Sequence, residues 1–134
     1  MSSAILDALW TKLATTSGSG FVADLGGRVW LDLAPDDEAL PLCVYSGTTT
    51  RFERSVSGID HTMRVVFSLY DSADTNADIV AAQNKLRSLL DGAALTATGY
   101  DRVLCQLRSR GVPTLQDDSW TLSEEYELRG RLTT

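Results

Sequence analysis

Residues 120–132 alternate between apolar and polar side chains more regularly than any other part of the chain. This period of two is that of a β-strand, in which successive side chains point to opposite faces of a sheet. The apolar face carries Trp120, Leu122, Tyr126, Leu128 and Leu132. Glu124 interrupts this face near its middle. A long strand with one apolar face predicts a sheet that is covered on that face by a second layer.

Four further segments have the character of strands. They are residues 28–33, a segment that begins after Pro41 with Leu42, Val44 and Tyr45, residues 61–70, and residues 102–108. Between the second and third of these, residues 47–60 are polar and rich in residues that favour strands. We expect them to extend both strands past the body of the sheet as a hairpin arm, with its tip near Ser57 and Gly58.

Two segments have the periodicity of amphipathic helices. The first places Ile5, Leu6, Leu9, Trp10 and Leu13 at helical spacing, and we expect Trp10 in the core. The second spans residues 78–90 and ends at Gly92, a residue typical of helix C-termini. The order of elements predicts an α+β two-layer sandwich, with a mainly antiparallel four- to five-stranded sheet, two helices on one face and the extended β-hairpin arm. Residues 1–134 form one domain by length.

Charge and hydropathy exclude several classes of function. The net charge of −6 argues against non-specific binding of nucleic acid, which needs a basic surface. The apolar runs are only a few residues long, so we expect no membrane span. Asp7 interrupts the first apolar segment, which argues against a signal peptide. We therefore expect Cys43 and Cys105 to be reduced, buried thiols.

The sequence offers no recognisable group of residues for catalysis. His61 is the only histidine and has no evident nucleophile or orienting acid, so we interpret it as a surface or hairpin residue. The acidic runs 36–38 and 117–118 lack the spacing of a calcium loop, which favours solvated loops. The glycines between residues 18 and 27 lack the lysine of a phosphate-binding loop. We predict a protein that is not an enzyme, with no catalytic, cofactor-binding or metal-binding residues.

Several short motifs occur in a recognisable order. They are Gly27-Arg28-Val29, Ala34-Pro35, the segment from Leu40-Pro41 to Tyr45, the strand from Arg64 to Asp71, the helical pattern of residues 78–90, and Tyr126 in the last strand. In this order they resemble the tail-completion, or tail-terminator, proteins of long-tailed bacteriophages and gene transfer agents. The resemblance covers nearly the whole chain. Leu42 stands where that family commonly has an aromatic residue.

The resemblance implies a structural virion protein at the head–tail junction, assembled in the host cytoplasm. Proteins of this family form a hexameric ring on the head-proximal end of the tail tube, stop its polymerisation and present a docking surface to the head. The implied partners are further copies of the chain, the major tail tube protein and the head–tail connector or stopper protein. DNA would pass through the lumen without specific binding, which an acidic chain suits. No membrane and no cofactor is implied.

A ring needs complementary surfaces, in which one patch of a subunit binds a different patch of its neighbour. Trp30 alternates with Val29 and Leu31, so it packs at an edge or faces another subunit. The arm can reach a neighbour and add its edge strand to another sheet. The predicted contact residues are Trp30, Asp36, Asp37, Glu38, Arg51, Phe52, Arg54 and His61.

Three other functions remain open. The first is a neck, adaptor or stopper protein on the head side of the same junction. The second is a small hydrolase or ligand-binding domain that uses His61 or a pair of carboxylates. The third is a nucleic-acid module built on the arginines at positions 102, 108, 110, 129 and 131, which the interleaved acidic residues disfavour.

Overall fold

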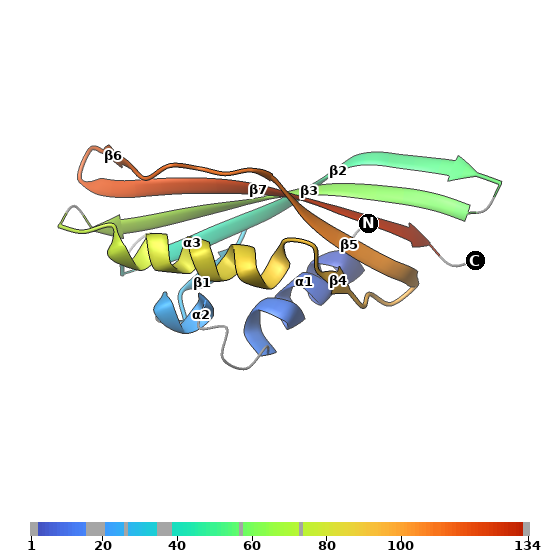
Figure 1. Ribbon diagram of the computed structural model, residues 1–134, viewed down its shortest axis with the longest axis horizontal. Helices are drawn as coiled ribbons and strands as arrows, with labels where there is room; N and C mark the ends of the chain where they lie inside the picture. The colour runs from blue at the N-terminus through green and yellow to red at the C-terminus, as the bar shows by residue number, and fades with distance from the viewer. Residues whose placement is uncertain are drawn as a thin grey trace.

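The computed structural model describes residues 3–15, 21–25, 27–34, 39–56, 58–72 and 74–132. Its helices are α1 (Ser3–Thr15), α2 (Phe21–Asp24) and α3 (Ala77–Leu90). Its strands are β1 (Val29–Leu31), β2 (Leu42–Ser55), β3 (Gly58–Ser72), β4 (Ala94–Leu95), β5 (Tyr100–Ser109), β6 (Thr114–Gln116) and β7 (Ser119–Leu132). The helices lie on one side of a long, twisted sheet, as Figure 1 shows, so the α+β class is confirmed.

The sheet has seven strands in the described part of the chain, which corrects the predicted number of four to five. Its order is β1-β2-β3-β7-β5-β4, and β6 pairs with β7 beyond the end of β5. Every pair is antiparallel except β1 with β2, which is parallel. The five predicted strands are present. The two that were missed, β4 and β6, have only two and three residues, too few for an alternating pattern.

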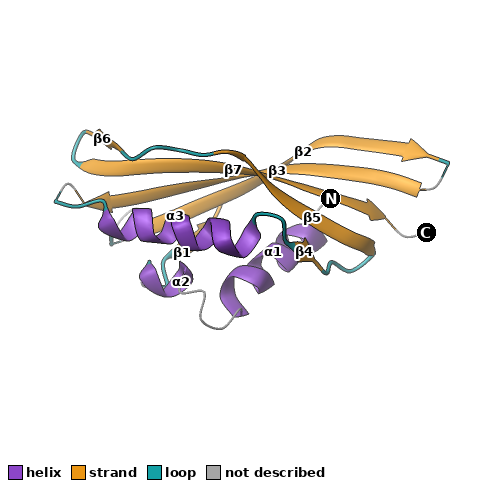
Figure 2. Cartoon of the chain, in the orientation of Figure 1, coloured by secondary structure: helices purple, strands orange, loops and turns teal. Residues whose placement is uncertain are grey.

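Both predicted helices form and cover one face of the sheet, together with the four-residue α2 that the sequence did not reveal (Figure 2). Phe67 of β3 lies at the centre of the core that results. Its ring centroid is 6.4 Å from that of Phe21, 5.5 Å from that of Tyr45 and 5.7 Å from that of Tyr126. All four side chains are buried, so strands and helix share one continuous apolar core.

Helix α1 buries a narrower stripe than the sequence predicted. Ile5, Leu9 and Leu13 are almost fully buried, whereas Trp10 is 39% exposed, so its expected place in the core was wrong. The physical reason is that α1 lies in the outer layer, where the described elements cover one side of it, and position 10 is turned away from the stripe at 5, 9 and 13.

The predicted hairpin is present, but it is not a separate arm. Strands β2 and β3 pair continuously from Leu42 opposite Tyr70 to Ser55 opposite Gly58. On its other side β3 remains paired with β7 as far as Ile59 opposite Leu132. On the far side of β7, β5 pairs with it from Tyr100 opposite Leu132. The extension is therefore four strands wide over most of its length, because β7 and the start of β5 continue alongside the hairpin. Ser57, part of the predicted tip, lies outside the described residues.

Gly47 marks the place where α1 meets the sheet. A Cβ atom at Gly47 would lie 2.8 Å from Met63 Sδ and 3.0 Å from Leu6 Cδ2, so a larger residue would push the ends of these two side chains aside. Beyond Gly47 the hairpin continues past the helices (Figure 1). We call the part of the sheet around the β2–β3 turn, the start of β5 and the end of β7 the distal end.

Candidate assembly surface

The outer edge of β2 is open over most of the distal end. Strand β1 pairs only with residues 43–45 of β2, and the amide of Asp32 donates one further bond to Tyr45. No other described strand pairs with this side of β2. An edge of this kind presents backbone donors and acceptors that another chain can use.

A bulge shapes this edge strand. The register with β3 shifts between Thr49 and Arg51, which leaves Thr50 as the extra residue. The Thr50 hydroxyl donates to the carbonyl oxygen of Thr62 at 3.3 Å. Bulges bend a strand and increase its twist, so this one sets the direction in which the last residues of β2 project.

His61 ties three strands together beneath the bulge. Its Nε2 lies 2.9 Å from the Thr49 hydroxyl on β2, and its Nδ1 lies 2.7 Å from the Tyr100 hydroxyl on β5. A neutral ring donates from one nitrogen and accepts at the other, and both hydroxyls can play either part. The ring also makes an edge contact with Phe52, with centroids 5.2 Å apart.

The burial of His61 corrects the idea of a surface histidine. The residue lies in the hairpin, as one of the two expectations had it, but is only 2% exposed. Burial lowers the pKa of His61 below its ordinary value, since the charged ring would lose its hydration. With so little accessible surface, His61 packs beneath the exposed Phe52 and is poorly placed to contact a partner itself.

The exposed residues of the distal end combine apolar and basic side chains. Phe52 is 59% exposed, and Val56 in the turn is fully exposed. Arg54 is exposed on the same face of β2 as Phe52, whereas Arg51 is exposed on the other face, where it forms an ion pair with Glu53. No ion pair of Arg54 occurs among the described residues. Three of the predicted contact residues, Arg51, Phe52 and Arg54, are thus brought together on one exposed strand, while their role as contacts stays a prediction.

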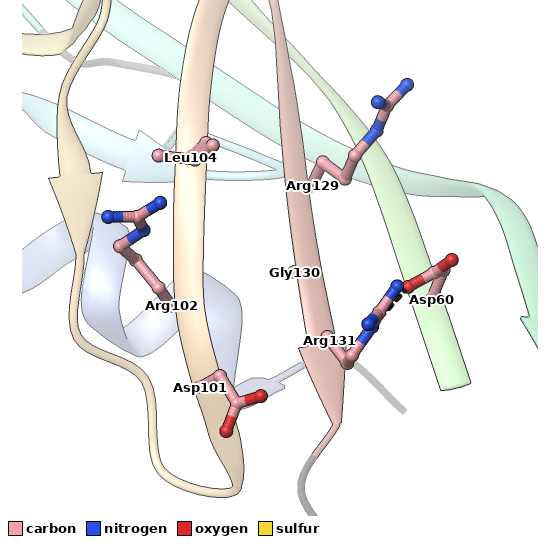
Figure 3. Close-up of a pocket in the computed structure, with 7 residues that line it drawn as sticks. All are labelled: Asp60, Asp101, Arg102, Leu104, Arg129, Gly130 and Arg131. Carbon is pink, nitrogen blue, oxygen red and sulfur yellow. Dashed lines mark hydrogen bonds and ion pairs between the residues drawn. The ribbon is translucent and has the colours of Figure 1, made fainter. Parts of the chain in front are cut away.

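The opposite face of the sheet carries a shallow depression between β5 and β7. Its lining residues are Asp60, Asp101, Arg102, Leu104, Arg129, Gly130 and Arg131. Figure 3 shows Arg131 reaching across to Asp60, with Arg131 Nε 2.9 Å from Asp60 Oδ1, while Arg102 points away from this pair. The hydrogen bond from Arg131 lowers the pKa of Asp60 and, reciprocally, raises the pKa of Arg131. Both groups therefore stay charged near neutral pH.

Further along this face, ion pairs connect neighbouring strands. Arg64 lies 3.8 Å from Glu125, and Arg108 lies 3.4 Å from Glu127. Arg129 is 3.7 Å from the same Glu127. Such exposed pairs contribute little stability, so the face is best understood as a solvated one.

Trp30 lies on the open face of β1, beside Val44 of β2, and is half-buried. Its indole Nε1 is covered, yet it has no hydrogen-bond partner in the described part of the chain. Buried donors usually find an acceptor. The other predicted contact residues, Asp36, Asp37 and Glu38, lie outside the described residues.

A buried polar cluster lies at the other end of the molecule. Glu124 is 1% exposed, and its carboxylate accepts bonds from Gln83 Nε2 at 2.8 Å and from the Tyr126 hydroxyl at 3.0 Å. Gln83 also donates to the carbonyl oxygen of Gly111 at 2.9 Å. Burial raises the pKa of Glu124, although the two bonds oppose this. The interruption of the apolar face signalled Glu124, but nothing in the sequence linked it to Gln83.

The described residues add three observations on other chemistry. Cys43 and Cys105 are buried as predicted, and burial raises the pKa of both thiols. The described side chains include no group of three histidine, cysteine, aspartate or glutamate residues that could hold a metal ion. Within the same residues, none of the helices has the length and apolar character needed to cross a bilayer.

Comparison with known proteins shows similarity to solved structures. No protein-family model and no curated protein matches this sequence. A chain from the virion of a native gene transfer agent particle matches with a TM-score of 0.79 at 16% sequence identity, over 97% of this chain and 96% of that chain. A second solved chain, of unnamed function, matches with a TM-score of 0.70 at 14% identity, over 100% of this chain and 98% of the other. The protein therefore shares its fold, over nearly its whole length, with a component of that virion.

Proposed function

We propose that this protein is a structural component of a phage-like virion that closes the head-proximal end of the tail tube as a ring. The observation that carries the proposal is the fold shared with a chain of a gene transfer agent virion, at a TM-score of 0.79 over 97% of the chain. The order of short sequence motifs leads independently to the same class of protein. In such a ring the chain would act through its surfaces.

The distal end supports this function physically. Its open strand edge, its two exposed apolar side chains and its arginines are features of a surface that binds another protein. The net charge of −6 suits a ring through which DNA must pass, because acidic groups repel phosphates. The partners would be further copies of the chain, the tail tube protein and the connector or stopper of the head.

The decisive experiment removes the gene from the genome that produces the particles. We expect tails of irregular length, or heads and tails that do not join, in negative-stain images. Complementation with the wild-type gene should restore normal particles. Normal particles in the absence of the protein would overturn the proposal.

A binding experiment separates this function from that of a neck protein on the head side. Tagged protein is incubated with isolated tails and, in parallel, with isolated heads, and the bound fractions are compared. A tail terminator should be retained by tails that lack it. Retention by heads alone would instead support an adaptor or stopper. Size-exclusion chromatography with light scattering should give a hexamer, or a monomer that forms rings only on tubes, and a stable dimer would contradict the ring.

A further inference from the structure

The two ends of the long sheet carry opposite charge. The distal end contains five arginines and three carboxylates. The arginines are Arg51, Arg54, Arg102, Arg129 and Arg131, and the carboxylates are Glu53, Asp60 and Asp101. These residues lie near the β2–β3 turn, the start of β5 and the end of β7, which the register brings together at Ile59, Tyr100 and Leu132. Arg54 and Arg102 have no ion-pair partner among the described residues. The distal end is therefore locally basic in an acidic protein.

The other end of the sheet is acidic, with four exposed carboxylates against the exposed Arg110, which lies beside Val112. The β6–β7 turn contains Asp117 and Asp118, both exposed. The pairing of Ser72 with Ser119 brings the end of β3 to the same place, and the exposed Asp74 and Asp78 follow in the turn and the first turn of α3. None of these four carboxylates forms an ion pair within the described residues. Figure 1 shows that β6 and the β2–β3 turn lie at opposite ends of the longest axis.

Each end also exposes apolar side chains and an open strand edge. The distal end has Phe52 and Val56, beside the unpaired edge of β2. The acidic end has Leu115, 50% exposed, on β6, which pairs only with β7 among the described strands. Val112, just before β6, is 76% exposed. The two surfaces thus match in apolar character and oppose each other in charge.

We infer that the distal end of one copy of this chain docks on the β6–β7 end of a second copy. Two different patches then form the contact, and such a heterologous contact repeats from subunit to subunit until it closes a ring or continues as a filament. A contact between two distal ends would place arginines against arginines, so charge favours the head-to-tail arrangement. That the repeated contact closes into a ring rests on the proposed function, and the distal end and the β6–β7 end are the surfaces that would form the contact.

Cysteine cross-linking tests the contact on the full chain. Val56→Cys is placed in one copy and Leu115→Cys in another that carries a mass tag, and the mixture is oxidised. We expect more heterodimer than either homodimer. In the matched control, the second copy carries Leu33→Cys in place of Leu115→Cys. Leu33 is 81% exposed but lies after β1, away from both ends. The native thiols should stay silent because both are buried.

Charge reversal then tests the pairing of the two ends. Arg54→Glu in the first copy, or Asp118→Lys in the second, should abolish the excess of heterodimer, and the two reversals together should restore it. Equal cross-linking to the Leu33 position, a preference for the Val56 homodimer, or indifference to charge reversal would overturn the inference. These results do not depend on the fate of particles without the protein. If cross-linking fails but particles made without the gene are defective, the proposed function stands and the inferred contact is wrong. If cross-linking succeeds but particles made without the gene are normal, the proposed function alone is wrong.

Discussion

Phe67 and Phe52 project from the same face of the sheet but meet opposite environments. Phe67 lies in the half that the helices cover, fully buried among three other aromatic rings. Phe52 lies in the half beyond the helices, where it rests against His61 and stays 59% exposed. The same residue type thus serves folding at one end and is available for binding at the other. What differs is the second layer, which ends near Gly47.

The largest effect should come from removing the ring at the covered end. Phe67→Ala should lower the free energy of unfolding by about 3–5 kcal/mol, because it removes the centre of the core and leaves a cavity. Phe52→Ala should cost about 1 kcal/mol or less, since its surface is mostly solvated already. Urea denaturation of both variants checks the comparison. Equal losses would mean that the distal end is part of the cooperative core.

A smaller loss should follow Gly111→Ala. The Cβ atom would lie 1.9 Å from the carbonyl oxygen of Ser123, a backbone atom that cannot move without displacing β7. We expect a loss of about 1–3 kcal/mol, as for overpacking elsewhere. Gly99→Ala is a useful contrast: its Cβ would meet nothing within 4 Å, although its φ of +86° strains any side chain. Thermal denaturation should rank Gly111→Ala as the more harmful, and the reverse order would argue against the close approach of the two segments.

At the distal end, His61→Ala should destabilise the fold by about 1–2 kcal/mol, because the bonds to Thr49 and Tyr100 are lost. Arg54→Ala, on the same hairpin but exposed, should change stability by less than about 0.5 kcal/mol. Hydrogen exchange should show faster opening of β2 in the His61 variant only. A hydrolytic activity that disappears with His61→Ala, while assembly persists, would instead favour the enzymatic alternative.

The smallest effect should appear only as a dependence on pH. The raised pKa of Glu124 means that the folded protein binds this proton more readily than the unfolded chain, so its contribution to stability falls as the pH rises above about 4.3. The free energy of unfolding of Glu124→Gln, measured relative to that of the wild type, should therefore be higher at about pH 7.5 than at about pH 4.5. The contribution of His61 to the pH dependence of stability has the opposite sign, since its lowered pKa favours the folded state above about pH 6.5. Both proteins contain His61, so this contribution cancels in the comparison.

Urea denaturation at the two pH values gives the measurement for Glu124. Glu125→Gln, the neighbour on the other face, is the matched control and should follow the wild type more closely. A Glu124→Gln variant whose stability parallels that of the wild type at both pH values would contradict the assignment.

Elements whose signal is local and long could be predicted from the amino-acid pattern. The alternation in β7 and β3 and the helical spacing in α1 and α3 follow from the period of two or 3.6 residues that one buried face imposes. The hairpin could be predicted for the same reason, and so could Arg51, Phe52 and Arg54 as exposed residues on it. Five strands and two helices were thus available from pattern alone.

Features that depend on partners distant in the chain became visible in the folded protein. Burial of His61 requires Tyr100, which lies 39 residues further along the chain, and the cluster at Glu124 requires Gln83 from α3. Trp10 is exposed because no described element covers the outer side of α1, and β4 and β6 exist because longer strands offer them an edge. A periodic pattern reports which face of an element is buried, whereas these outcomes depend on which other element arrives at that face.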